Sequence, residues 1–194
     1  MTEYDTDQIY FPSEDTFLLI KAALAEVQPT DRVLEIGTGS GAVAKSVMDV
    51  APNTLAVEIN PHAVAYAREV NGVKVIRGDL FEPVTGEFDL ILFNAPYLPT
   101  SPEERGNDWL EYALDGGTTG REVVERFLTK APAYLSTCGR ILLLISSLTG
   151  MDETLKLCRS LGLIVLIVAE EKQEDGEILY VLRISRDLCS LCGT

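Results

Sequence analysis

The stretch that most constrains the fold is an apolar run that leads into a glycine-rich turn. Residues 32–36 (Arg-Val-Leu-Glu-Ile) have the character of a short buried strand. The turn Gly37-Thr38-Gly39-Ser40-Gly41 follows, and a helical pattern begins at Ala42. Glycines allow a tight turn and let the backbone approach a ligand closely. A strand, a glycine-rich turn and a helix in this order predict an open α/β sheet with a ligand site beyond the carboxyl end of the strand.

The remaining segments repeat this alternation. An amphipathic helix is expected before the first strand, with Ser13 as its N-cap, and another helix begins at Asn60-Pro61. Further strands are predicted at residues 54–58, 73–76, 88–93, 139–145, 163–168 and 178–183, with helices at 121–134 and 152–160. The short charged segment 170–177 predicts a hairpin, so the last strand is expected to be antiparallel. Residues 97–120 are predicted to form a long polar loop, a candidate for binding substrate.

These elements predict one α/β domain over residues 1–194, with a seven-stranded, mostly parallel sheet, an antiparallel last strand and helices on both faces. A short N-terminal arm and helix (about 1–28) precede a core (about 29–185), and a tail (186–194) ends the chain. The tail carries Cys189 and Cys192 with CxxC spacing. A frayed segment is the expectation there and a zinc or redox role the alternative; no metal site is predicted.

Charge and hydropathy limit the partners of such a chain. The net charge is −14, from 30 acidic and 16 basic residues. A surface this acidic repels phosphate backbones, so no nucleic acid partner is expected. The N-terminus lacks a secretory pattern, and the apolar runs are shorter than the ~20 residues that cross a bilayer. We therefore expect a cytoplasmic protein without membrane contact, whose acid-rich composition resembles that of proteins from high-salt archaea.

Polar side chains follow four of the predicted strands, namely Glu35, Glu58, Asp79 and Asn94. An acid after the second strand typically accepts hydrogen bonds from ribose hydroxyls, which suits either NAD or an adenosine-bearing sulfonium. Glu35 would repel a pyrophosphate, whereas it suits a cationic amino-acid group. No lysine follows the glycines as in a P-loop, so ATP is not expected. Together these residues favour S-adenosyl-L-methionine over NAD.

The stretch Asn94-Ala95-Pro96-Tyr97 ends the apolar run 88–93. Pro96 biases Ala95 toward an extended backbone, so the Ala95 carbonyl takes a defined direction beside the Asn94 side-chain oxygen. Two acceptors side by side can hold an NH2 group, and Tyr97 offers a flat face for a planar group. We therefore predict a site for a planar amine or amide next to the cofactor.

Several motifs together resemble the HemK family of glutamine methyltransferases, class I enzymes that modify a glutamine side-chain amide in peptide chain release factors. The motifs are Val33-Leu34-Glu35-Ile36-Gly37-Thr38-Gly39-Ser40-Gly41, Glu58-Ile59-Asn60-Pro61, Gly78-Asp79-Leu80 and Asn94-Ala95-Pro96-Tyr97. The segment Tyr10-Phe11-Pro12-Ser13-Glu14-Asp15-Thr16-Phe17-Leu18-Leu19 resembles the short archaeal and eukaryotic branch. The resemblance covers about residues 9–184 and implies the Rossmann-like fold of class I methyltransferases.

The resemblance implies a set of residues around S-adenosyl-L-methionine. Glu35 and Gly37 would face its methionine portion, Glu58 its ribose, and Asp79 with Leu80 its adenine. The full set is Thr16, Glu35, Gly37, Thr38, Gly39, Gly41, Glu58, Ile59, Asp79, Leu80 and Asn94.

The motif of the family is Asn-Pro-Pro-Tyr, and this chain departs from it, because Ala95 stands where the family has the first proline. Alanine keeps the backbone carbonyl that this position contributes, so we expect the chemistry to persist. Asn94, Ala95, Pro96 and Tyr97 are the predicted catalytic residues, with Asn94 and Tyr97 in contact with the substrate.

The resemblance also implies partners. The substrate would be the archaeal or eukaryotic-type release factor, methylated at N5 of the glutamine in its Gly-Gly-Gln motif. A small zinc-binding activator protein would form a heterodimer by adding a strand to the sheet edge at Val73-Lys74-Val75-Ile76. Three alternatives stay open: an adenine-N6 DNA methyltransferase, which the acidic charge disfavours, a protein-lysine methyltransferase, and a non-catalytic scaffold that binds the cofactor.

Overall fold

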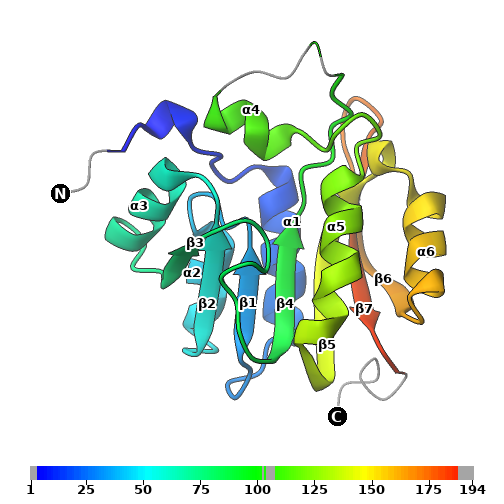
Figure 1. Ribbon diagram of the computed structural model, residues 1–194, viewed down its shortest axis with the longest axis horizontal. Helices are drawn as coiled ribbons and strands as arrows, with labels where there is room; N and C mark the ends of the chain where they lie inside the picture. Colours follow the sequence, from blue (N-terminus) through cyan, green and yellow to red (C-terminus); the bar gives the residue numbers. More distant parts are fainter. Residues whose placement is uncertain (1–3, 102, 104–107, 188–194) are drawn as a thin grey trace.

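The computed structural model describes residues 4–101, 103 and 108–187, which form a seven-stranded sheet in the order β3-β2-β1-β4-β5-β7-β6 (Figure 1). The strands are β1 (Val33–Ile36), β2 (Thr54–Glu58), β3 (Val75–Arg77), β4 (Phe88–Asn94), β5 (Leu135–Ser146), β6 (Ile164–Lys172) and β7 (Ile178–Ser185). Strands β1 to β5 pair in parallel, and β7 runs antiparallel to both of its neighbours. The predicted mostly parallel sheet with an antiparallel last strand is therefore confirmed.

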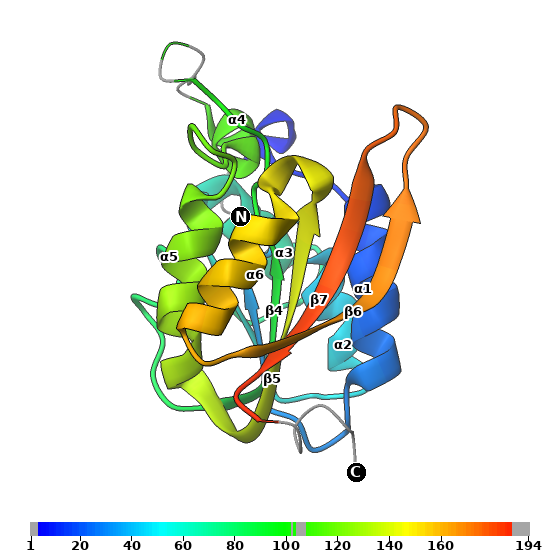
Figure 2. The same cartoon turned by 90° about the vertical axis from the view of Figure 1, so that its right-hand side faces the viewer.

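Helices cover both faces of the sheet (Figure 2). Three lie on one face: α1 (Glu14–Glu26), α2 (Ala42–Met48) and α3 (Pro61–Glu69). Two lie on the other: α5 (Glu122–Lys130) and α6 (Met151–Ser160). Every residue of β1 is buried, as expected of a parallel strand covered on both sides.

Short polar signals set the helix starts. At the start of α1, the Thr16 hydroxyl accepts a hydrogen bond from the backbone N–H of Ser13, at 3.4 Å. At the start of α3, the Asn60 side chain accepts from the backbone N–H of His62 at 2.9 Å, and Pro61 occupies the first helical position. Both predicted caps are confirmed, and Asn60 begins α3 directly after β2 ends at Glu58.

Several element boundaries differ from the prediction, and β5 begins four residues earlier than expected, at Leu135. The edge strand β3 begins at Val75 rather than Val73, because the Val73 N–H bonds to the Ala67 carbonyl and closes the end of α3 first. The helix predicted at 121–134 divides into α5 and the 3-10 helix η2 (Ala131–Tyr134), because Pro132 lacks the N–H that an α-helix needs there. Strand β6 continues to Lys172, so the predicted hairpin is confirmed but its strands are longer.

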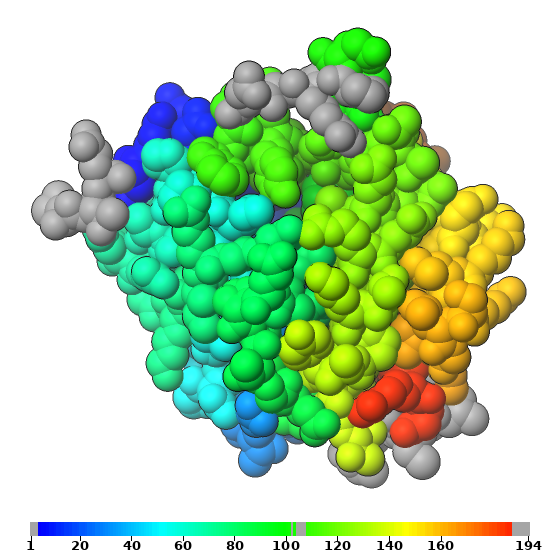
Figure 3. All heavy atoms as spheres, viewed as in Figure 1, coloured from blue at the N-terminus to red at the C-terminus, as the bar shows by residue number. Residues whose placement is uncertain are grey.

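The predicted loop 97–120 was wrong in one respect, because it contains the helix α4 (Trp109–Leu114). The Asp108 side chain caps this helix by accepting from the Glu111 N–H at 2.8 Å. Helix α4 rests against the 3-10 helix η1 (Thr6–Gln8) at the top of the molecule (Figure 3). It has only six residues and none of them is buried, so its short apolar stretch does not reach the length over which a helical period can be read.

Two expectations concern the ends of the chain and the membrane. Cys189 and Cys192 lie outside the described residues. Among the helices of the described ranges, none is long and apolar enough to cross a membrane.

Candidate active site

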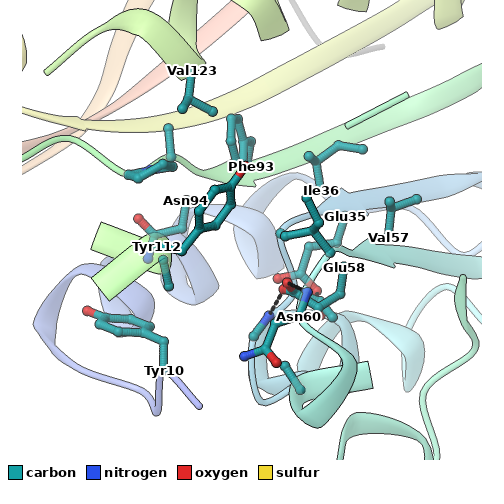
Figure 4. Close-up of a pocket in the computed structure, with 18 of the residues that line it drawn as sticks. Tyr10, Glu35, Ile36, Val57, Glu58, Asn60, Phe93, Asn94, Tyr112 and Val123 are labelled. Atoms are coloured by element: carbon teal, nitrogen blue, oxygen red, sulfur yellow. Dashed lines mark hydrogen bonds between the residues drawn. The ribbon is translucent and has the colours of Figure 1, made fainter. Parts of the chain in front are cut away.

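A cavity opens at the carboxyl ends of β1, β2 and β4. In Figure 4, Glu35 and Glu58 lie at one end of it, and Asn94 and Tyr10 lie at the other. Of the residues predicted for the site, those that line the cavity are Thr16, Glu35, Gly37, Thr38, Gly39, Glu58, Ile59, Asp79, Leu80, Asn94, Ala95, Pro96 and Tyr97. Gly41 is not among the lining residues.

The glycine turn serves two different purposes. Gly41, with φ of +88°, is the N-cap of α2, and a Cβ there would lie 2.9 Å from the Cβ of Ala67 on α3. Gly41 therefore allows two helices to pack closely. Gly39, with φ of +53°, approaches the N-terminal arm so closely that a Cβ would lie 3.1 Å from the Tyr10 carbonyl oxygen. Gly39 thus lets the arm close over the turn beside the cavity.

Glu35 is a buried carboxyl at the end of β1, with 2 % of its surface exposed. Its Oε2 accepts hydrogen bonds from the Thr38 hydroxyl at 2.5 Å and from the Ala44 N–H at 2.9 Å. Burial raises the pKa of Glu35 to about 8, and the neighbouring charge of Glu58 adds to the rise. A cationic ligand group would favour the ionised carboxylate, so this end of the cavity suits a positive charge.

Glu58 connects the glycine turn to the start of α3. Its Oε2 accepts from the Gly39 N–H at 2.8 Å, and its Oε1 accepts from the Asn60 N–H at 2.9 Å. Burial raises the pKa of Glu58, and the hydrogen bonds from these backbone N–H groups offset only part of that rise. Each carboxylate oxygen keeps a second lone pair, so Glu58 can also accept from a pair of sugar hydroxyls.

Asp79 and Leu80 line the cavity beyond β3. Arg126 of α5 donates to Asp79 Oδ2 at 2.5 Å, which fixes the position of the carboxylate at the cavity. Leu80 has φ of +50°, a left-handed conformation that a leucine adopts only under constraint. Backbone strain of this kind concentrates at functional sites, which supports a ligand-binding role for this loop.

At the opposite end of the cavity from Glu35, the most informative feature is the side-chain oxygen of Asn94. Its Oδ1 is buried and has no hydrogen-bond partner among the residues that the structure describes. A buried acceptor left unpaired costs about 1–3 kcal/mol, so such an atom is expected to meet a donor from a ligand. The following residue, Ala95, is 2 % exposed and lines the same cavity. The site therefore presents an amide-type acceptor to an NH group.

Two tyrosines and one aspartate surround this acceptor. The Tyr10 hydroxyl donates to Asp15 Oδ2 at 2.9 Å, and Asp15 Oδ1 accepts from the Thr16 N–H at 2.5 Å and from its hydroxyl at 3.1 Å. Partial burial, together with the Asp15 charge, raises the pKa of Tyr10 and of Tyr97. Both phenols are therefore neutral hydrogen-bond donors at physiological pH.

The N-terminal arm and α4 form the roof of the cavity. Gln8 joins them to α3, because its side-chain oxygen accepts from the Trp109 N–H at 2.9 Å and its carbonyl accepts from Asn60 Nδ2 at 2.7 Å. Trp109 and Tyr112 of α4 line the cavity from above. In the described ranges, no group of three histidine, cysteine or acidic side chains is arranged to hold a metal ion.

Sequence reasoning missed several of these lining residues. Trp109 and Tyr112 were hidden in the predicted loop, and nothing in the local pattern pairs Arg126 with Asp79. Tyr10 and Asp15 belong to the N-terminal motif, and their positions on either side of the predicted cap Ser13 could have indicated a role in the site.

Comparison with known proteins places these features in a family. Residues 14–105 match the family model of the methyltransferase small domain. A protein of Methanocaldococcus jannaschii, named as a protein N5-glutamine methyltransferase, is 43 % identical over 180 residues, with 90 % of each chain covered. The mouse methyltransferase HEMK2 is 37 % identical over 194 residues, covering 92 % of this chain and 90 % of its own.

A solved structure agrees with these relatives. The Mtq2-Trm112 complex of E. cuniculi, responsible for methylation of the eRF1 translation termination factor, contains a chain that matches with a TM-score of 0.77 and 26 % identity. The match covers 93 % of this chain and 99 % of that one. The predicted class I methyltransferase fold is thereby confirmed, and the chain belongs to the HemK family of methyltransferases.

Proposed function

We propose that this protein transfers a methyl group from S-adenosyl-L-methionine to N5 of the glutamine in the Gly-Gly-Gln motif of the archaeal or eukaryotic-type release factor. The observation that carries the proposal is the buried, unpartnered Oδ1 of Asn94, which lies in one cavity with Glu35 and Glu58. One end of the cavity suits a cationic nucleoside and the other suits an NH2 donor. The names of the similar archaeal and E. cuniculi proteins support the same substrate.

The cofactor fits the acidic end of the cavity. Glu35 would face the cationic methionine portion, Glu58 the ribose hydroxyls, and Asp79 Oδ1 the adenine amino group. Thr16, Thr38, Ile59 and Leu80 would pack around it, with the turn glycines Gly37 and Gly39 beneath. When bound, the cofactor supplies a methyl group on a strongly electrophilic sulfonium.

The amide end of the cavity would act mainly by orientation. A carboxamide nitrogen is a poor nucleophile, because its lone pair is delocalised into the carbonyl. Asn94 Oδ1 and the Ala95 carbonyl would accept the two N–H bonds of the glutamine amide, aim its nitrogen at the methyl carbon and stabilise the positive charge that develops on it. Pro96 holds the carbonyl in place and Tyr97 packs on the amide plane. The nitrogen would gain the methyl group as the bond between the methyl carbon and sulfur breaks, the neutral thioether S-adenosylhomocysteine would leave, and one N–H proton would pass to solvent.

The Ala95 position sharpens the chemical requirement. The family motif has a proline here, whereas this chain has an alanine that is 2 % exposed. Alanine lacks the ring that fixes φ in proline and so loses some stiffness, but Pro96 still biases its backbone toward an extended conformation, which keeps the carbonyl directed. What the site needs at this position is a backbone acceptor.

A small activator protein would complete the enzyme in the cytoplasm. The E. cuniculi relative is a complex with Trm112. In this chain β3 is an edge strand, so an activator strand could add to Val75–Arg77 and form a heterodimer around a single methyltransferase domain. The edge at which this docking is proposed thus lies two residues beyond the start that the sequence predicted.

A labelling assay tests the proposed function. Purified protein, the Trm112-type activator of the same organism and radiolabelled S-adenosyl-L-methionine are incubated with the release factor or with its variant that carries alanine at the motif glutamine. Label is expected on the first substrate and not on the second. Equal labelling of both would refute glutamine as the acceptor.

A further inference from the structure

The open edge of the sheet at β3 offers backbone groups to another strand. The Ala56 N–H of β2 donates to the Lys74 carbonyl at 2.9 Å, and Ala56 stands opposite Val75 in the parallel register. In such a ladder the residues on either side of Val75 bond to β2, so the N–H and C=O of Val75 point away from the sheet. The same holds for Arg77.

A side chain from α3 already occupies this edge. Arg68 donates through Nε to the Val75 carbonyl oxygen at 3.0 Å, and its Nη2 donates to the same oxygen. Both hydrogen bonds converge on the one carbonyl that faces outward at the start of the strand. A guanidinium that directs two donors at one oxygen fills the space from which a new strand would present its N–H.

Two exposed apolar side chains near β3 are consistent with a surface that a partner covers. Val70, at the end of α3, is 49 % exposed, and Ile76 of β3 is 37 % exposed. Ile76 belongs to the edge strand itself and Val70 precedes it in sequence, and apolar side chains at an open edge are a hazard that proteins counter with charged groups. Arg68 supplies such a charge in the free chain, and it does so through a contact that can be reversed.

We propose that Arg68 guards the strand-addition site of β3. In the free chain its guanidinium covers the Val75 carbonyl, and an incoming activator strand displaces it by donating its own N–H to that oxygen. The inference rests on the proposed function, since it takes the activator to add a strand at this edge. Arg68 then lowers the affinity for the activator, and it protects the free chain from pairing with unrelated strands.

The experiment compares two cationic side chains, Arg68 and Lys45, each of which donates to a backbone carbonyl. Arg68→Met keeps most of the side-chain length and removes every donor. Lys45→Met is the matched control, because Lys45 lies on α2, outside the proposed docking strand, and its Nζ also donates to a backbone carbonyl, that of Asn71, at 3.0 Å. The dissociation constant of the Trm112-type activator of the same organism is measured for each by isothermal titration calorimetry.

If Arg68 guards the edge, Arg68→Met should bind the activator about three- to tenfold more tightly, the range of one net hydrogen bond, and Lys45→Met should change the affinity by less than about twofold. Arg68→Lys, which keeps a charge with fewer donors, should lie between wild type and Arg68→Met. Equal or weaker binding by Arg68→Met would overturn the guard, because Arg68 would then be neutral or part of the interface. Thermal unfolding of each free variant verifies that the fold is retained.

Glutamine methylation is measured in the same samples, so that a wrong guard role for Arg68 can be told apart from a wrong proposed function. If wild type binds the activator and labels the glutamine while Arg68→Met binds no tighter, the guard is wrong and the proposed function stands. If wild type does not bind the activator, both the docking and the guard are refuted. Labelling of the motif glutamine by the chain alone would then still support the methyl transfer.

Discussion

Glu35 should make cofactor binding strongly dependent on pH. Burial raises the pKa of this carboxyl to about 8, so most of it is protonated in the free protein near neutrality. A cationic cofactor next to it favours the ionised form, and binding therefore releases a proton. Affinity for S-adenosyl-L-methionine should therefore rise as pH rises through neutrality, whereas a carboxyl with a lowered pKa would be ionised throughout this range and would give no such dependence.

The size of the effect follows from the ionised fraction. With a pKa of about 8, about 1 % of Glu35 is ionised at pH 6.0 and about 25 % at pH 7.5. If the ionised form is the one that binds, the apparent dissociation constant should fall about 25-fold over this range. Glu35→Gln cannot titrate, so its affinity should change by less than about threefold.

The assay is isothermal titration at both pH values with two ligands. 5′-Methylthioadenosine lacks the cationic amino-acid portion but keeps the ribose, so it reports any titration of Glu58 without that of Glu35. The wild-type pH dependence should be steep for S-adenosyl-L-methionine and shallow for 5′-methylthioadenosine. Parallel slopes for wild type and Glu35→Gln with the full cofactor would refute the assignment of Glu35 to the cationic portion.

Three further substitutions probe separate parts of the site. Tyr10→Phe removes the donor to Asp15 but keeps the ring, so the methyl-transfer rate should fall about three- to tenfold while calorimetry shows unchanged cofactor affinity; an unchanged rate would remove Tyr10 from the amide end. Arg126→Gln releases Asp79, and adenosine binding should weaken about two- to fivefold, since the pair is partly exposed; unaltered binding would argue against Asp79 as the adenine acceptor. Gly41→Ala forces a Cβ to within 2.9 Å of that of Ala67 at φ of +88°, so urea unfolding should show a loss of about 1–3 kcal/mol; wild-type stability would contradict the packing role.

Local patterns explain why much of the site could be predicted. A buried strand followed by glycines fixes where Glu35 and the turn lie, and parallel strands bring their carboxyl ends to one edge, so Glu58 and Asn94 meet there without any further information. The caps at Ser13 and Asn60 depend on neighbours within three residues, which a sequence displays directly.

The features that escaped prediction depend on tertiary contact. Helix α4 is only six residues long, which is too short for a helical period to be read, and its place over the cavity depends on Gln8, about one hundred residues earlier in the chain. The pairing of Arg126 with Asp79 joins two segments that no local rule connects. The true start of β3 depended on a hydrogen bond from Val73 back to α3, which strand propensity cannot anticipate.

The central claim is that Asn94 holds the nitrogen that receives the methyl group. The most direct measurement is the single-turnover rate of glutamine methylation by Asn94→Ala at saturating S-adenosyl-L-methionine, with cofactor affinity determined in parallel. Loss of the preorganised acceptor should lower the rate at least about 100-fold, while cofactor binding persists in part because Glu35, Glu58 and Asp79 remain. A rate within about tenfold of wild type would contradict the account, because one acceptor of an oriented pair should be worth more than that.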